Sequence, residues 1–194
     1  MKKILLKVPR RQRSIEIARD FLKSKGNPCV PIPVEQHLME LSTLIKFRDE
    51  EEEGFGVMEA SGRYRIYVNT SIIQGRDLWT YAHELAHIVL GHYDDFDYKQ
   101  LSDRCLYYLD QEADYFVSEY LMPQYGFEDY FFFKGRPKYF NPQYIGTLKN
   151  FFGVSWTAMI LRLHTLNYQD YKKSKEYIKD YKKKRKKLFY CKKS

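Results

Sequence analysis

The segment His83-Glu84-Leu85-Ala86-His87 has the residue types and the spacing of a metal site on a helix. Residues four apart on an α-helix lie about 40° apart around its axis, so both histidines project from one face and can bind a single ion. Glu84 would lie beside that ion, where a general base acting on an attacking water belongs. The apolar neighbours of the motif indicate a core helix, in which polar side chains need a polar partner. The pattern therefore predicts a catalytic zinc (Zn²⁺) site at His83 and His87, with Glu84 as the catalytic base.

A catalytic zinc needs a third protein ligand, and the helix expected over residues 106–121 carries several carboxylates. A helical wheel places Asp110 and Asp114 on the apolar side of this helix, and Glu112 and Glu119 on the opposite side. Carboxylates on an inward face are costly unless they are paired or bind a metal. The wheel therefore favours Asp110 as the third ligand and Asp114 as the acceptor of a ligand histidine's N–H. The alternative is that both aspartates are helix-surface acids.

The remaining histidines give weaker signals. His92 follows Gly91, beyond the expected end of the motif helix, so we expect a solvent-facing loop histidine, with a structural or transition-state role as the alternative. His37 and His164 lie singly in apolar helical patterns and are expected to be packing or surface residues. The sequence contains no glycine-rich phosphate loop, nucleophile elbow or Cys–His signature.

The spacing of apolar residues predicts the elements that must position these side chains. Helices are expected over residues 14–25, 34–41, 76–90, 106–121, 142–152 and 156–166. A short strand is expected over residues 44–47, and two β-rich runs around Gly62, residues 55–60 and 64–69, predict a hairpin. The predicted fold class is α+β: mainly helical, with a small sheet, the histidine motif on a core helix, and extra helices toward the C-terminus.

Composition and charge divide the chain into two parts. The 194 residues are 44% hydrophobic and 17% aromatic, which excludes a largely disordered chain. The net charge is +8, but residues 172–194 hold 12 Lys or Arg against 2 acidic residues, which leaves 21 basic and 23 acidic residues in 1–171. We therefore expect one domain over residues 1–171 and a Lys-rich tail over residues 172–194. The tail is either a solvated segment or a contact for nucleic acid or an anionic membrane surface.

Cysteine usage and hydropathy indicate the compartment. The three cysteines are widely spaced and form no CxxC pair, which argues against a disulfide framework or a cysteine zinc site. No segment approaches the roughly 18 continuous apolar residues that span a bilayer. We therefore expect a soluble cytoplasmic protein that does not bind a membrane.

Three segments resemble the ImmA/IrrE family of metallo-endopeptidases: HELAHIVLGH at 83–92, QEADYFVSEYLMP at 111–123 and FGVSWTAMILRL at 152–163. The resemblance covers roughly residues 14–168. It implies a zincin-like, gluzincin-type zinc peptidase that cleaves helix-turn-helix (XRE-type) transcriptional repressors in mobile-element or stress-response regulation. The family's third ligand is usually a Glu four residues before the Asx that begins the Asx-aromatic-apolar stretch. In this sequence that position is Asp110, so the implied ligand set is His83, His87 and Asp110, with Glu112 as a fallback.

The implied mechanism is hydrolysis in which Glu84 takes a proton from the water that attacks a peptide carbonyl. The sequence does not assign the group that stabilises the oxyanion, for which His92 and a nearby tyrosine are candidates. The strand near Tyr64–Val68 could pair with an extended substrate. Two other functions stay open. One is a non-catalytic regulatory binding protein with a structural metal site, and the other is a nucleic-acid-associated protein that acts through its basic tail.

Overall fold

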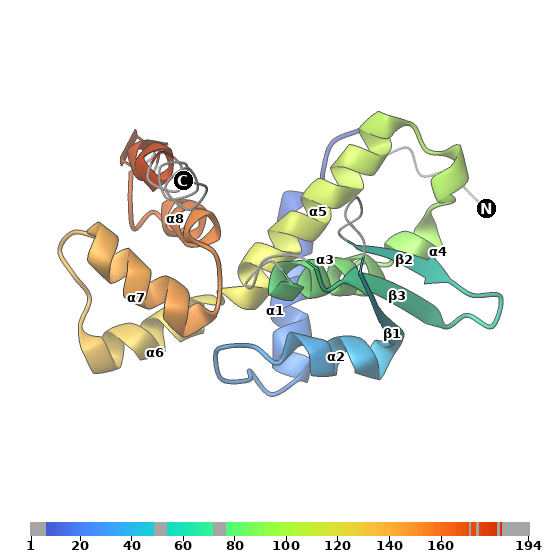
Figure 1. The fold of residues 1–194 in the computed structure, drawn as a ribbon, viewed down its shortest axis with the longest axis horizontal. Coiled ribbons are helices and arrows are strands. Elements are labelled where there is room, and N and C mark those ends of the chain that lie inside the picture. Colours follow the sequence, from blue (N-terminus) through green and yellow to red (C-terminus); the bar gives the residue numbers. More distant parts are fainter. Residues whose placement is uncertain are drawn as a thin grey trace, which may run out of the picture.

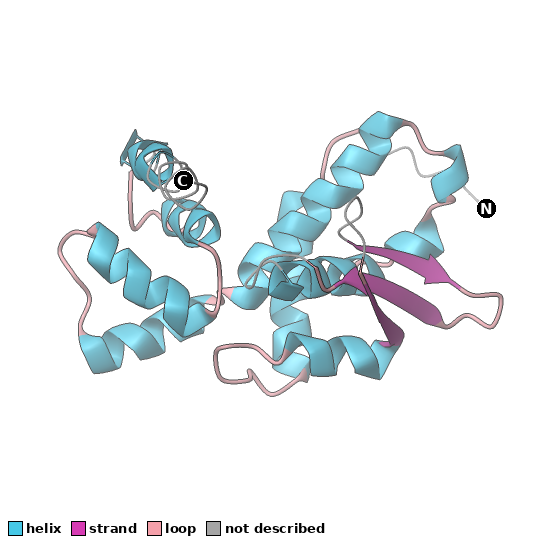
Figure 2. Cartoon of the chain, in the orientation of Figure 1, coloured by secondary structure: helices cyan, strands magenta, loops and turns pink. Residues whose placement is uncertain are grey.

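The computed structural model describes residues 7–48, 54–71 and 77–170, together with 172–173, 175–181 and 183. Within these residues it is mainly helical with one small sheet, so the predicted α+β class is confirmed (Figures 1 and 2). The elements are α1 (Arg11–Ser24), α2 (Val34–Leu41), β1 (Ser42–Phe47), β2 (Gly54–Met58), β3 (Tyr64–Asn69), α3 (Asp77–Val89), α4 (His92–Asp95), η1 (Tyr98–Gln100), α5 (Asp103–Leu121), α6 (Gln124–Lys134), α7 (Pro142–Phe152) and α8 (Trp156–Thr165).

Local capping explains where the later helices begin and end. Ser102, Asn141 and Ser155 each accept a hydrogen bond from a backbone N–H in the first turn of α5, α7 and α8, respectively. Such caps satisfy N–H groups that have no partner within the helix. Gly153 ends α7 at φ 69°, a left-handed conformation that glycine adopts without a steric penalty. These signals are local, and the predicted bounds of α7 and α8 agree with the structure to within one residue.

The sheet has the order β1-β3-β2, with β1 parallel and β2 antiparallel to β3. The predicted hairpin is confirmed as β2 and β3. Because β3 pairs on both sides, its residues 64–68 have no free edge, and the expectation that a substrate pairs with this strand is wrong. Strand β2 lies at the edge of the sheet and has no strand neighbour on its outer side among the described residues.

One cluster of buried apolar side chains runs through the described part of the chain, from α1 to α8. The sheet covers one side of α3, and α5 crosses on its other side before leading into α6, α7 and α8 (Figure 1). This arrangement gives α3 a buried face toward the core and a second face toward α5. The fully buried side chains that α3 and α5 contribute to this cluster include Ala82, Leu85, Ala86, Ala113, Phe116 and Val117.

A buried ion pair joins α8 to α5. Arg162 donates from Nη2 to Glu119 Oε2 at 2.7 Å and from Nε to the carbonyl of Met122 at 3.0 Å. The other oxygen of Glu119 accepts from Nε of Arg19 at 2.9 Å, but the Arg19 side chain is 46% exposed, whereas that of Arg162 is 5% exposed. Arg162 therefore neutralises Glu119 on the buried side, where water cannot replace it.

Replacing Arg162 by Met should lower the free energy of unfolding by about 3 kcal/mol, because Glu119 is left as a buried charge with only a partly exposed partner. Arg19→Met should cost only about 0.5 kcal/mol, since its pair with Glu119 is solvent-screened. Urea unfolding of the two variants measures both values. Equal losses would contradict the assignment of Arg162 as the buried partner.

The end of the chain continues as helix where it is described, at residues 172–173, 175–181 and 183. Tyr181 stacks on Trp156 of α8, with ring centroids 5.6 Å apart, so the first part of the expected tail packs on α8. The remainder of the 172–194 tail lies outside the described residues. Among the described residues, none of the helices combines the length and the apolar composition that crossing a bilayer requires.

Candidate metal centre

Helix α3 presents both histidines of the motif on the face toward α5. Its opposite face is buried in the core through Ala82, Leu85 and Ala86, and this packing fixes the rotation of the helix. The Nε2 atoms of His83 and His87 lie 3.1 Å apart. Two nitrogens bound to one zinc at 2.0–2.1 Å in tetrahedral geometry would be about 3.3 Å apart. The spacing of the two rings therefore suits a shared ion.

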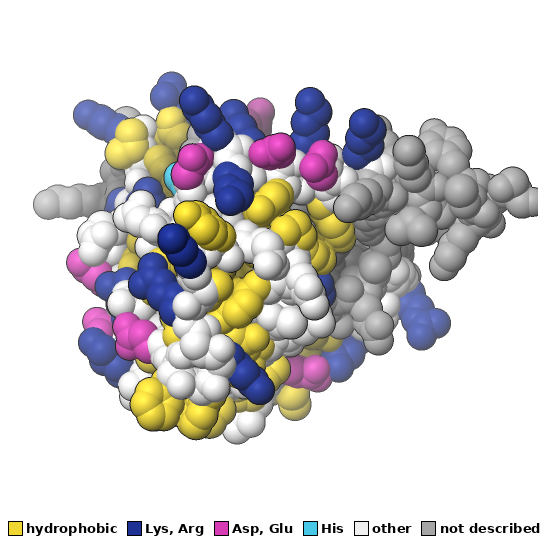
Figure 3. Space-filling view, turned by 90° about the vertical axis from the view of Figure 1, so that its left-hand side faces the viewer, with side chains coloured by type: hydrophobic (Ala, Val, Ile, Leu, Met, Phe, Trp, Pro, Cys, Tyr) yellow, Lys and Arg dark blue, Asp and Glu magenta, His cyan; other side chains and the backbone are white. Residues whose placement is uncertain are grey.

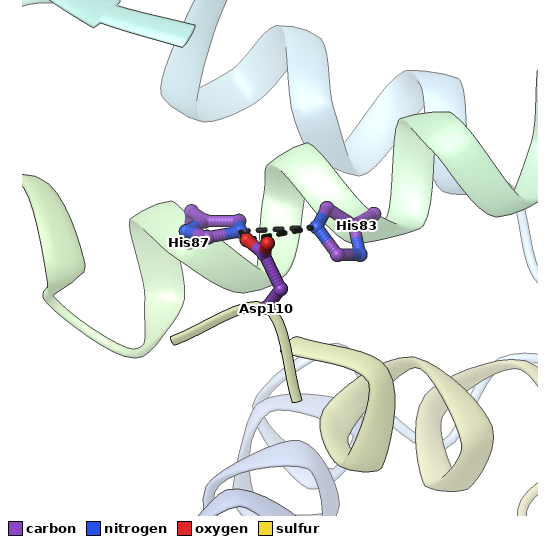
Figure 4. Close-up of side chains that lie close together, drawn as sticks. All are labelled: His83, His87 and Asp110. Carbon is purple, nitrogen blue, oxygen red and sulfur yellow. Dashed lines mark hydrogen bonds and ion pairs between the residues drawn. The ribbon is translucent and has the colours of Figure 1, made fainter. Parts of the chain in front are cut away.

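Asp110 of α5 faces the two histidines (Figure 4). Its Oδ1 lies 3.9 Å from His83 Nε2 and 3.7 Å from His87 Nε2. One ligand atom from each of these three residues lies within 4.8 Å of the others. Two imidazole nitrogens and one carboxylate oxygen form a donor set suited to zinc and leave a fourth position open. The residues therefore fit a zinc ion. Asp114, one turn further along α5, has Oδ1 3.3 Å from His83 Nδ1.

Glu84 lies at the same cleft and is 6% exposed. Tyr93 of α4 donates its hydroxyl hydrogen to Glu84 Oε2 at 3.0 Å. Burial, opposed in part by His83 and Tyr93, raises the pKa of the Glu84 carboxyl. A raised pKa suits a group that must accept and later release a proton near neutral pH.

The acids of α5 do not face as the helical wheel predicted. Glu112 and Glu119 are buried, whereas the side chains of Asp110 and Asp114 are 59% and 54% exposed. The wheel assumed one apolar face, but α5 packs against α1 as well as α3. Glu112 and Glu119 can be buried because Arg10 and Arg162, respectively, pair with them. Asp110 and Asp114 do lie toward the histidines, but on an open cleft and not in the core.

The expected solvent exposure of His92 is also wrong, since this side chain is 0% exposed. Gly91 takes a φ of 76° and turns the chain, so that His92 lies behind His87. His92 Nδ1 is 3.1 Å from His87 Nδ1, and His92 Nε2 is 3.2 Å from Glu112 Oε2. His92 therefore faces away from the cleft, where it could not contact an oxyanion.

Sequence reasoning missed Arg10, which lies 102 positions before its partner Glu112. Its backbone N and its Nε donate to Glu112 Oε1 at 2.6 and 2.8 Å, and its Nη2 donates to Oε2 at 2.8 Å. Burial alone would raise the pKa of Glu112, but the hydrogen bonds from His92 and Arg10 outweigh it and lower this pKa to about 2. Glu112 is therefore ionised and fully paired. No local pattern in the sequence reveals a pair so distant along the chain.

The charges around the two histidines differ. Burial opposes the protonation of His83, but Asp110 and Asp114 outweigh it and raise the pKa of His83 to about 9. Burial, with the nearby His83 and His92, lowers the pKa of His87 well below its usual value. His87 is thus a neutral imidazole, the form that binds a metal. A cation that binds between the rings would compete with the proton on His83.

These residues line an open cavity of about 510 Å³. The edge strand β2 borders it, and the missing side chain of Gly56 leaves room for Tyr93, because a Cβ at this position would clash with the Tyr93 hydroxyl. The cavity can admit an extended chain of several residues along the sheet edge. Its walls are Gly54, Phe55, Gly56, Trp79, Thr80, His83, Glu84, His87, Tyr93, Tyr98, Asp110 and Asp114.

Comparisons with known proteins give a family match and similarity to several solved structures. The family described as the IrrE N-terminal-like domain (Peptidase_M78) matches residues 39–164. None of the curated proteins matches the sequence. Among solved structures, the fold is similar to that of a Mycobacterium tuberculosis transcriptional regulator, with a TM-score of 0.53 and 17% identity. The similarity covers 78% of this chain and 46% of the regulator, so this chain spans about half of that protein's length.

Proposed function

Since the chain belongs to the IrrE N-terminal-like (M78 peptidase) family, we propose that it is a zinc-dependent endopeptidase that cleaves a helix-turn-helix transcriptional repressor. The observation that carries the proposal is the cluster of His83, His87 and Asp110 beside a buried Glu84 in an open cleft. We further propose that residues 1–171 form one peptidase domain. A DNA-bound repressor as substrate implies a cytoplasmic location.

The three clustered residues would hold the ion, and Asp114 would position His83 through its Nδ1. When bound, zinc supplies a Lewis acid that polarises the scissile carbonyl and acidifies the attacking water. Glu84 takes the proton of that water on its carboxylate and later delivers it to the leaving amine. Its burial favours this role, because a carboxyl with a raised pKa holds the proton between the two steps.

Strand β2 is suited to bind the substrate backbone. It lies at the sheet edge and its residues 54–56 border the cleft. An extended peptide can add to this edge through main-chain hydrogen bonds, which leaves its side chains to determine specificity. A linker or a locally unfolded segment of a repressor has the conformation that such an edge requires.

The experiment that tests the function is digestion of a degenerate peptide library, followed by digestion of purified helix-turn-helix repressors, with products identified by mass spectrometry. We expect fragments whose masses sum to the substrate plus one water. Cleavage should require zinc and disappear with a chelator. Cleavage that persists in the absence of metal would contradict the proposal.

Tyr93→Phe should lower kcat about 100-fold, the typical effect of removing one oxyanion donor. Its hydroxyl lies 3.0 Å from Glu84 Oε2 and lines the cleft beside the ligands, so it can turn to the developing oxyanion once Glu84 carries a proton. Steady-state kinetics with a peptide substrate measures the effect. Tyr144→Phe is the control, because Tyr144 lies on α7 and is not part of the cleft lining. A change in KM alone would assign Tyr93 to substrate binding.

A second candidate function, contact with nucleic acid, is favoured by the face formed by α6, α7 and α8. Figure 3 shows Lys and Arg side chains beside hydrophobic ones over this face. Phe132 and Phe133 are 83% and 78% exposed, and Lys138 and Lys173 both lie over the ring of Tyr139. Basic side chains interleaved with exposed aromatic ones are typical of surfaces that bind phosphate backbones and bases.

Truncation after Lys183 should weaken binding to a labelled DNA duplex roughly 10-fold, with a shallower salt dependence. It removes six basic residues of the tail and keeps the stacking of Tyr181 on Trp156. Each lost phosphate contact lowers the slope of log K against log salt by about 0.9. Fluorescence anisotropy at several salt concentrations measures both quantities. An unchanged slope would assign the tail to solubility.

A further inference from the structure

A continuous chain of buried polar groups leads from the metal-facing ring of His87 to the segment before α1. His87 Nδ1 lies 3.1 Å from His92 Nδ1, and His92 Nε2 lies 3.2 Å from Glu112 Oε2. Arg10 then binds both oxygens of Glu112. The side chains of His92 and Glu112 are both 0% exposed, so water cannot replace the hydrogen bond between them, whereas the Arg10 side chain is 27% exposed. The roles described so far leave His92, Glu112 and Arg10 without a function.

Complete burial favours a neutral His92, and with a neutral His92 the donors and acceptors of these hydrogen bonds can be arranged in only one way. Arg10 can only donate, and an ionised carboxylate can only accept. His92 must therefore carry its proton on Nε2 and donate it to Glu112, which leaves the lone pair of His92 on Nδ1. That lone pair requires a proton on His87 Nδ1, because two unprotonated nitrogens 3.1 Å apart would repel each other. His87 is then left with its lone pair on Nε2, the atom that faces His83 and Asp110.

Tyr98 cannot fix the tautomer of His87 in place of Glu112. Its hydroxyl lies 2.9 Å from His87 Nδ1, but a hydroxyl can donate or accept and is compatible with either tautomer of the ring. Only an obligatory acceptor at the end of the chain fixes the direction of every hydrogen bond. Glu112 is that acceptor.

We propose that Glu112, acting through His92, holds His87 in the tautomer that offers Nε2 to the metal, and that Arg10 locks Glu112 in this role. His92, Glu112 and Arg10 are positioning residues, and the segment that precedes α1 is part of the construction of the metal centre. The inference rests on the proposed function only in that His87 binds the metal. It predicts that His87 already adopts this tautomer in the metal-free protein.

A purely structural ion pair between the α1 segment and α5 is the competing explanation, and the chain provides a matched control for it. Glu119 lies on the same helix as Glu112, is also buried, and also pairs with arginines, Arg19 and Arg162. The hydrogen bonds of Glu119 go to these two arginines and not to a histidine. Glu119→Gln should therefore reproduce the stability cost of losing a buried carboxylate without an effect on His87.

Glu112→Gln should reverse the direction of the hydrogen bonds that link residue 112, His92 and His87. Because Arg10 donates to both oxygens, the amide oxygen will stay at the Oε1 position with its two Arg10 donors, and the amide NH₂ will face His92 Nε2. His92 must then accept at Nε2 and protonate Nδ1, which leaves His87 protonated at Nε2. Zinc affinity should fall between 10- and 100-fold, as is typical when a partner of a ligand histidine is lost. Glu112→Asp keeps an obligatory acceptor and should retain most of the affinity.

The test combines two readouts on the full chain. Long-range ¹H–¹⁵N NMR of the metal-free protein at pH 10, where His83 has lost the proton that it could donate to His87 Nε2, reports which nitrogen of His87 and His92 carries the proton. Competition with a chelator reports zinc affinity. We expect His87 protonated at Nδ1 and His92 at Nε2 in wild type and in Glu119→Gln, and both reversed in Glu112→Gln. Thermal unfolding of each variant shows that it is folded.

The outcomes separate this inference from the proposed function. Wild type that binds no zinc refutes the metal centre, whereas the tautomers can still be read in the metal-free protein. Zinc binding by wild type, with equal affinities and unchanged tautomers in Glu112→Gln, overturns the role of Glu112 alone. Equal losses of affinity in Glu112→Gln and Glu119→Gln would show a structural effect and would also overturn it.

Discussion

Glu84→Gln should lower kcat for peptide hydrolysis by about 1,000-fold, since a positioned general base contributes roughly 10²–10⁴. The amide keeps the volume of the carboxyl and can still accept the hydrogen bond from Tyr93, but it cannot take a proton from the attacking water. Zinc content should stay at one ion per chain, because Glu84 is not among the clustered ligands. Single-turnover cleavage and metal analysis of the same preparation measure both quantities.

The same variant distinguishes a peptidase from a non-catalytic binding protein that uses its metal to hold a surface. A binding protein would be unaffected by the loss of a general base, whereas a peptidase should still bind its repressor and fail to cleave it. Unchanged cleavage by Glu84→Gln would contradict the role of Glu84. Glu59→Gln is a suitable control, because Glu59 lies outside the cleft and pairs with Arg65.

His87→Ala should weaken zinc binding by roughly 150-fold. Zinc sites in small domains supply about 10–16 kcal/mol, so each ligand of a four-coordinate site contributes about 3 kcal/mol. Asp110→Ala should have a similar effect if its carboxylate completes the set with His83 and His87. Chelator competition with the purified variants measures the affinities.

Asp114→Asn is the matched control for Asp110→Ala, because both aspartates lie one turn apart at the same cleft. Asp114 touches only the Nδ1 side of His83, so its replacement should cost at most about 10–100-fold in affinity. A larger loss of zinc affinity in Asp114→Asn than in Asp110→Ala would show that Asp114 is the ligand and that Asp110 positions His83. Full zinc affinity in Asp110→Ala would show that another residue supplies the third ligand.

The parts of the fold encoded by short-range signals could be predicted from the sequence. The cap at Ser155, the left-handed Gly153 and the hairpin around Gly62 depend on residues within a few positions of one another, and the predicted elements agree with the structure there. The spacing of His83 and His87 on one helix is likewise local. The sequence does not predict the parallel pairing of β1 with β3, because this pairing depends on where the packing of α2 places the start of β1.

The parts that depend on long-range contacts could not be predicted. A helical wheel gives the directions of the side chains on α5 but not which directions neighbouring helices cover. The wheel places Glu112 on the outside because it carries no information on the partner Arg10, which lies 102 positions earlier. The sequence places His92 in solvent for the same reason, since its burial depends on Glu112. Whether a charged residue is buried can therefore be predicted only when its ion-pair or hydrogen-bond partner is known.

An anomalous difference map at the zinc absorption edge, from crystals of the protein grown with zinc, is the most direct test of the metal centre. We predict one peak within about 2.0–2.2 Å of Nε2 of His83, Nε2 of His87 and a carboxylate oxygen of Asp110, with Glu84 beyond bonding distance. A peak bound by Glu112 or Asp114 in place of Asp110, or the absence of a peak between the two histidines, would contradict the proposed centre.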